Sequence, residues 1–186
     1  MVKCTHNRAG DIITNITKEE MNKIAFCLKW FYHANKPKTK AHKAEFQKCK
    51  IIEEIGELGQ AFALGKWKPK KYSSYEEVRG SIESELADVC IAVLGYLQMT
   101  GRQVLVFEDL LPLTYSEDVF MFKLLNYASD EEFCKLFSLI CSFSIDNGID
   151  ILYNIRERLK FNYTRAARYR DGLNKRQIKE ERNGQC

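Results

Sequence analysis

The stretch that decides the fold is Ile51-Ile-Glu-Glu-Ile-Gly-Glu-Leu58, in which Glu54 and Glu57 stand three residues apart. Residues three apart lie on one face of an α-helix, about 5–6 Å apart at Cβ. The isoleucines and the leucine around them are apolar and are expected to face a core. This stretch therefore predicts a helix that holds two acidic side chains beside its buried face.

A second stretch, Ile82-Glu-Ser-Glu-Leu-Ala-Asp-Val89, carries Glu85 and Asp88 at the same spacing. Few lysines stand four residues away to pair with any of the four acids. Burying several carboxylates is costly unless a cation compensates them. The two stretches together predict a cation site between two helices. The alternative is an acidic stripe exposed to solvent.

The available ligand types favour a hard divalent cation. Di-iron helical bundles use Glu-x-x-His pairs, whereas the histidines here, His6, His33 and His42, all precede the acidic stretches. A site made of carboxylate oxygens alone favours Mg²⁺, with Mn²⁺ as the alternative. Glu53, next to the first pair, is a candidate partner of the ligands or the catalytic base that activates a water.

Composition limits the classes of protein that this chain can belong to. Its 186 residues, 45% of them hydrophobic, allow one good core. The net charge of +4 is too small to indicate nucleic-acid binding, although residues 156–182 hold ten Lys or Arg against four acidic residues. Seven cysteines without a CxxC pair indicate reduced thiols and a cytoplasmic location. No stretch reaches the ~18 apolar residues of a membrane span, so no membrane-spanning helix is expected.

Apolar periodicity predicts an all-α fold. The expected helices cover residues 17–34, 40–64, 75–99, 118–127, 130–145 and 149–168. Thr17 with Glu20, and Ser74, are expected to cap the first and third helices, and Gly65 to end the second. Residues 102–117 read as a loop, because a lone strand would have no partner.

The expected organisation is one helical domain over residues 1–172, with a helical insertion at about 102–146 before the last helix. Residues 173–186 are polar and are expected to form a flexible tail. The insertion could extend the core, form a dimer interface or cover a pocket.

The two acidic stretches resemble the signature of the all-α nucleoside triphosphate pyrophosphohydrolases, often called MazG-like. That family shares an ExxE helix followed some tens of residues later by an ExxD helix. The run from Lys50 to Leu58 is similar to the first motif, including the preceding lysine, and Glu85-Leu-Ala-Asp-Val89 to the second. The segment from Arg158 to Arg165 is similar to the family's last helix. The resemblance covers roughly residues 20–100 and 147–172.

The resemblance implies a MazG-like four-helix bundle core and a Mg²⁺-dependent hydrolase that converts a nucleoside triphosphate to the monophosphate and pyrophosphate. The substrate would be a canonical or non-canonical nucleotide, deoxynucleotides included, and the enzyme a homodimer or a dimer of dimers. The metal ligands would be Glu54, Glu57, Glu85 and Asp88. Candidate contacts to phosphate or sugar are Lys50, Arg158, Asn162 and Arg165, and Trp67 is a candidate for stacking on the base.

Two other functions stay open. The first is a catalytically silent helical interaction or regulatory protein that keeps its acids for structure. The second is an RNA-associated protein that uses the basic C-terminal region, although aromatic residues there are few beyond Tyr163 and Tyr169.

The chain departs from the MazG-like pattern in one connection. About 45 residues separate the ExxD helix from the last helix, where that family often has a short connection.

Overall fold

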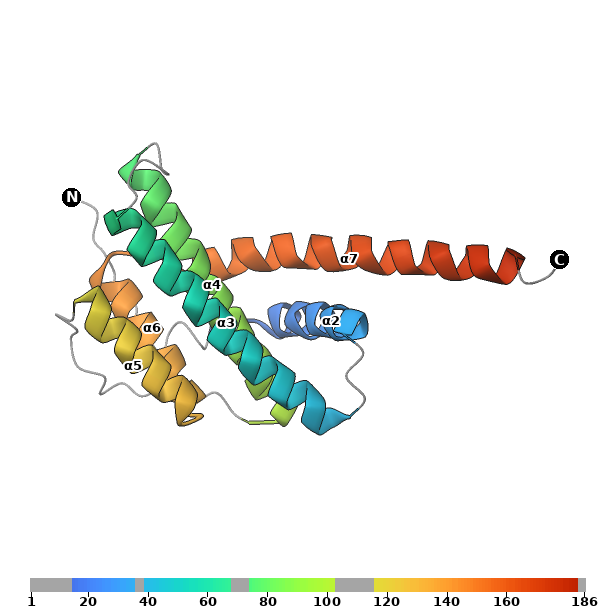
Figure 1. The fold of residues 1–186 in the computed structure, drawn as a ribbon, viewed down its shortest axis with the longest axis horizontal. Helices are drawn as coiled ribbons and strands as arrows, with labels where there is room; N and C mark the ends of the chain where they lie inside the picture. Colours follow the sequence, from blue (N-terminus) through green and yellow to red (C-terminus); the bar gives the residue numbers. More distant parts are fainter. Residues whose placement is uncertain (1–14, 36–38, 68–73, 103–115, 184–186) are drawn as a thin grey trace.

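The part of the chain that the structure describes is almost entirely helical (Figure 1). The computed structural model describes residues 15–35, 39–67, 74–102 and 116–183. Its helices are α2 (Lys18–Asn35), α3 (Lys40–Trp67), α4 (Tyr75–Thr100), α5 (Glu117–Ser129), α6 (Phe133–Asp146) and α7 (Ile151–Asn183). These residues contain no strand, which confirms the all-α prediction. Most of the expected loop at 102–117 lies outside the described residues.

Two helices start at the capping residues that the sequence indicates. Thr17 Oγ1 accepts a hydrogen bond from the Glu20 backbone N–H at 3.2 Å, and the Glu20 carboxylate accepts one from the Thr17 N–H at 2.7 Å. Ser74 accepts a hydrogen bond from the Glu77 N–H at 3.2 Å, and Gly101 ends α4 with a left-handed φ of 74°. Such caps satisfy backbone N–H groups that the start of a helix leaves without partners. Because a cap needs only residues three positions apart, the sequence alone indicates where these two helices begin.

Two helices run further than expected. Gly65 does not end α3, which continues to Trp67. A Cβ at Gly65 would lie 2.7 Å from Cγ1 of Val78, so the missing side chain permits the close approach of α3 and α4. Helix α7 passes Arg168 and ends at Asn183. Residues 173–183 of the expected tail are therefore helical, in keeping with the high helix propensity of Lys, Arg, Gln and Glu.

Helix α4 is the central helix and packs against α2, α3, α6 and α7. The twelve residues Leu86–Leu97 are all buried, as expected for a helix that is enclosed by its neighbours on every side. A Cβ at Gly95 would lie 2.8 Å from Leu28 Cδ1, so α2 approaches α4 closely there. From α3, the buried Gln47 donates a hydrogen bond from Nε2 to the Ala92 carbonyl oxygen at 2.8 Å. This bond satisfies a polar side chain inside the core.

Helices α5 and α6 extend the same core. Phe120 of α5 stacks on Phe143 of α6 with ring centroids 4.0 Å apart. Both rings meet Phe62 of α3 edge-on, at 6.3 and 6.0 Å. One buried hydrophobic cluster includes residues of α2, α3, α4, α5, α6 and α7. The described part of the insertion, residues 116–146, therefore enlarges the core.

Helices α2 and α7, from the two ends of the described chain, lie side by side (Figure 1). Arg156 donates from Nε to Glu20 Oε1 at 2.6 Å and from Nη2 to the Asn15 carbonyl oxygen at 3.0 Å. The rings of Phe26 and Tyr163 lie 4.8 Å apart. These contacts define how α7 packs along α2. Beyond α2, helix α7 extends away from the other helices toward the C-terminus.

Length and apolarity single out no individual helix among the described residues as a membrane span. Helix α6 and the first part of α7 meet these criteria only as a pair, Phe133–Asp146 with Ile151–Gly172, bent by 116°. The buried residues of α6 belong to the core cluster described above.

Phe120→Ala tests whether α5 belongs to the core. Phe120 is fully buried, so loss of its ring should lower the free energy of unfolding by about 3–5 kcal/mol. Phe122→Ala, on the same helix, removes a ring that is 64% exposed and should change it by less than about 0.5 kcal/mol. Urea denaturation of both variants measures the difference, and equal effects would contradict the packing of α5.

Candidate metal centre

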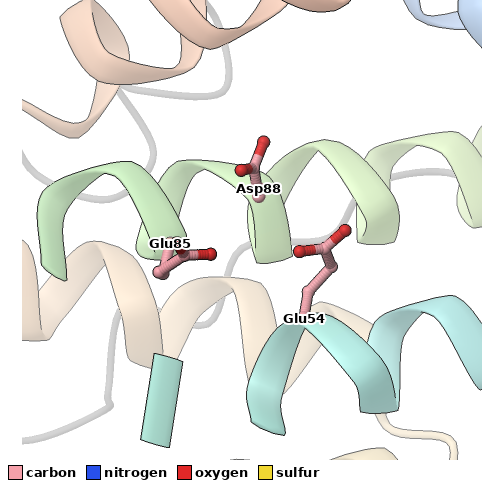
Figure 2. Close-up of side chains that lie close together, drawn as sticks. All are labelled: Glu54, Glu85 and Asp88. Atoms are coloured by element: carbon pink, nitrogen blue, oxygen red, sulfur yellow. The ribbon is translucent and has the colours of Figure 1, made fainter. Parts of the chain in front are cut away.

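Three carboxylates from two helices converge at one place (Figure 2). Glu54 comes from α3, Glu85 and Asp88 come from α4, and one oxygen of each lies within 4.8 Å of the others. The three-residue spacing places Glu85 and Asp88 on one face of α4, and the packing of α3 on α4 brings Glu54 to that face. We call Glu54, Glu85 and Asp88 the acidic triad.

The acidic triad lies at the edge of the hydrophobic core. Glu54 and Asp88 are each only 7% exposed. Burial raises the pKa of Glu54 to about 7, against a partial opposing effect of Lys50. Burial also raises the pKa of Glu85, and the charge of Asp88 adds to this effect. Both shifts mean that the charged carboxylates cost free energy unless cations lie close by.

Two basic side chains pair with the triad. On α3, Lys50 Nζ lies 2.7 Å from Glu54 Oε1 and 3.0 Å from Glu53 Oε1. From α7, Arg158 forms an ion pair with Asp88, and this hydrogen bond raises the pKa of Arg158. The sequence offers few lysines four residues from these acids, and Lys50, four residues before Glu54, is one that forms such a pair.

The third carboxylate of the triad shows no such pair within the described part of the chain. Glu85 Oε2 is buried, and no hydrogen-bond partner for it is found among the described residues. Lys50 and Arg158 pair with two of the three carboxylates, Glu54 and Asp88, and no ion pair is seen at Glu85 in the residues that the structure describes. All donors are carboxylate oxygens, the ligands that Mg²⁺ and Mn²⁺ prefer. The donor set and the unpaired oxygen therefore fit a hard divalent cation.

The other two acids of the first stretch lie beside the triad. Glu57, one turn after Glu54, is exposed and is not among the three carboxylates that converge. After burial itself, the charge of Glu57 is among the causes that raise the pKa of Glu54 and of Glu85. Glu53 is also exposed, and its carboxylate pairs with Lys50. The sequence thus predicted four ligands, and the structure brings three of them together.

The predicted substrate contacts lie on α7 and at the end of α3. Arg158 reaches the triad, and its guanidinium carbon also lies 5.4 Å from the ring centroid of Phe161, which is 56% exposed. Asn162, one turn further along α7, is half-buried, and Arg165 is exposed. Trp67 is the last residue of α3, and its side chain lies outside the described part of the structure.

Sequence reasoning assigned Lys50 and Arg158 to the substrate and missed their pairing with the triad. A signal for Lys50 was present, because a lysine three and four residues before glutamates can pair with them on a helix. No comparable signal exists for Arg158. Its partner Asp88 lies 70 residues away in the sequence, and the ion pair depends on how α7 packs on α4.

Comparison with protein-family models, with curated proteins and with solved structures found no match. The interpretation of the site therefore depends on its own geometry and on the spacing of its residues.

Glu54 should make the stability of the metal-free protein depend on pH. Its pKa of about 7 in the folded state lies above the ordinary value of 4.5, so the folded state holds this proton more tightly. The resulting stabilisation is present below the ordinary pKa and is lost as the pH rises through about 7, by up to about 3 kcal/mol. In Glu54→Gln this titration is absent.

Urea denaturation in the presence of a chelator measures the effect. The free energy of unfolding of Glu54→Gln relative to the wild type should rise between pH 5 and pH 8. Glu53→Gln, at an exposed neighbouring position, is the control and should show a much smaller change. A difference between Glu54→Gln and the wild type that does not vary with pH would contradict the buried, protonated Glu54.

Proposed function

We propose that this chain hydrolyses a nucleoside triphosphate to the monophosphate and pyrophosphate, with Mg²⁺, or alternatively Mn²⁺, as the metal. The observation that carries the proposal is the acidic triad, with its unpaired Glu85 oxygen and with Lys50 and Arg158 beside it. Carboxylates suit a divalent cation, and basic side chains suit phosphates. The resemblance of the two acidic stretches to MazG-like enzymes supplies the reaction type, cleavage between the α- and β-phosphates.

The triad would hold the metal, and Glu57, exposed on the next turn of α3, would be a further ligand. When bound, Mg²⁺ would neutralise phosphate oxygens and lower the pKa of a water molecule. Glu53 is the candidate base that takes the proton of the attacking water, since its carboxylate is exposed and lies within reach of the same Lys50 as Glu54. The water attacks the α-phosphorus, the bond to the bridging oxygen breaks, and pyrophosphate leaves.

Contacts to the phosphates and the sugar are proposed for residues on α3 and α7, the helices that supply cations to the triad. Lys50 and Arg158 carry positive charge next to it. Asn162 and Arg165 follow Arg158 at steps of four and three residues, which places all three on one face of α7. Trp67 is proposed to stack on the base. A homodimer and a cytoplasmic role in cleaning the nucleotide pool belong to the same proposal.

Glu85→Gln tests the proposed activity. The substitution removes the charge of the one triad carboxylate that no basic side chain is seen to pair with, so metal-dependent pyrophosphate release should fall by at least about 100-fold. The assay follows pyrophosphate with a panel of ribo- and deoxyribonucleoside triphosphates in Mg²⁺ and in Mn²⁺. The same panel identifies the preferred base.

The matched control for Glu85→Gln is Glu83→Gln, two residues earlier on α4. Glu83 pairs with Arg79 at 2.8 Å, outside the triad, so this variant should keep most of the activity. Wild-type protein that releases no pyrophosphate from any substrate of the panel would refute the proposed function. Equal losses in both variants would instead indicate a general effect on folding.

The second candidate function is a catalytically silent helical interaction protein. The observation that favours it is that Lys50 and Arg158 compensate two of the three carboxylates with no metal needed. On this interpretation the acidic triad and its cations form a structural charge network between α3, α4 and α7.

Thermal unfolding separates the two functions. A ligand at a hundred times its dissociation constant stabilises the folded state by about 2.7 kcal/mol, which for a chain of this size raises the melting temperature by about 5–10 °C. Mg²⁺ with a non-hydrolysable nucleoside triphosphate should produce such a shift if the proposed function is correct. A silent interaction protein should show none with any nucleotide of the panel.

A further inference from the structure

We propose that Lys50 and Arg158 are the counterions of the metal-free triad, that a divalent cation displaces them, and that their release prepares them to bind phosphate. This inference depends on the proposed metal-dependent function and concerns the coupling between metal and substrate. It assigns the same two side chains to the triad before metal binding and to the phosphates afterwards.

Lys50 and Arg158 reach the triad from its solvent side. Their side chains are 35% and 32% exposed, whereas those of their partners Glu54 and Asp88 are 10% and 8% exposed. The two cations come from α3 and α7 and pair with separate carboxylates. Each therefore covers one acid of the site that the metal would use, with its charged end at the boundary between solvent and core.

The metal and the two side chains compete for the same carboxylates. Lys50 Nζ lies 2.7 Å from Glu54 Oε1, and Arg158 pairs with Asp88 Oδ2, so the two cations contact two of the three carboxylates that would hold the metal. Like charges a few ångströms apart in a partly buried site repel each other strongly. Metal binding therefore favours movement of the ammonium and guanidinium groups outward, where they can pair with bound phosphates.

Each side chain has a second partner nearer the solvent. Lys50 already contacts the exposed Glu53 at 3.0 Å, so it can leave Glu54 and keep one ion pair. Arg158 lies 5.4 Å from the centre of the exposed Phe161 ring, a cation–π contact that can hold the guanidinium after Asp88 binds the metal. The release is therefore a short displacement between two existing partners.

The consequence is positive coupling between the metal and the phosphate ligand. The metal frees two cations for phosphate, and phosphate withdraws these cations from the triad. By linkage each ligand raises the affinity for the other by the same factor. A lysine that contacted only the substrate, and not the triad, would contribute to the affinity for phosphate and would leave the affinity for the metal unchanged.

The test is calorimetric titration of Mn²⁺ alone, and then of pyrophosphate at saturating Mn²⁺, into wild-type protein and two pairs of variants. Lys50→Met is matched with Lys48→Met on the same helix, whose ammonium pairs with Glu45 and Glu131 outside the triad. Arg158→Met is matched with Lys160→Met, whose ammonium pairs with Glu157. Both variants of a pair lose one positive charge from the same helix, so the long-range electrostatic effects of the two substitutions are alike.

Lys50→Met and Arg158→Met should bind Mn²⁺ at least about fivefold more tightly than their controls and bind pyrophosphate at least about fivefold more weakly. If Lys50→Met unfolds without metal, Mn²⁺ should refold it. Failure to refold would contradict the inference.

Failure of this inference and failure of the proposed function give different results. Wild-type protein that binds Mn²⁺ and releases pyrophosphate from nucleotides, with neither variant binding metal more tightly than its control, would overturn the counterion exchange alone. Tighter metal binding by both variants, without cleavage of any nucleotide, would support the exchange and refute the proposed enzyme.

Discussion

Negative charge at the edge of a hydrophobic core is the constraint on which this structure depends. Three carboxylates converge between α3 and α4, and an uncompensated buried charge would cost several kcal/mol. The compensation comes from Lys50 on α3 and from Arg158 on α7. The packing of α7 on α4 is therefore an electrostatic requirement as well as a means of burying apolar surface.

Helix α4 combines two properties that rarely occur together. Its residues Leu86–Leu97 are buried without a break, yet Asp88 in that stretch is an acid. On the side of α3 that meets α5, the stacked rings of Phe120 and Phe143 pack against Phe62. All three acids of the triad thus stand on helices that are held by the core, and sites on such elements keep their geometry better than sites on loops.

Local features of the sequence predicted the helices well and their ends less evenly. The caps at Thr17 and Ser74 are readable because capping depends on residues three positions apart. The expected helix end at Gly65 was wrong, because glycine occurs both at helix ends and at close contacts between helices. Only the position of Val78 in the folded structure distinguishes the two roles. The course of α7 past Arg168 follows from propensities that the polar composition concealed.

The candidate site shows the same division between local and distant information. The three-residue spacing predicted that Glu85 and Asp88 lie on one face of their helix. The packing of α3 on α4 then brings Glu54, which was also a predicted ligand, to the same place. Glu57 obeys the same spacing but faces solvent, because the rotation of α3 against α4 is decided by the whole core. The pairing of Arg158 with Asp88 joins residues far apart in the chain, and no spacing rule reaches that distance.

Glu20 connects two distant parts of the chain. Its carboxylate caps α2 and also binds Arg156, which lies 136 residues further along the chain and two residues before Arg158. A contact over such a separation requires closure of a long loop, which costs chain entropy. The ion pair of Arg158 with Asp88 requires a similar closure, because Arg158 stands on the same helix as Arg156. A fragment of the chain that lacked α7 would therefore contain α4 without the cation that neutralises Asp88.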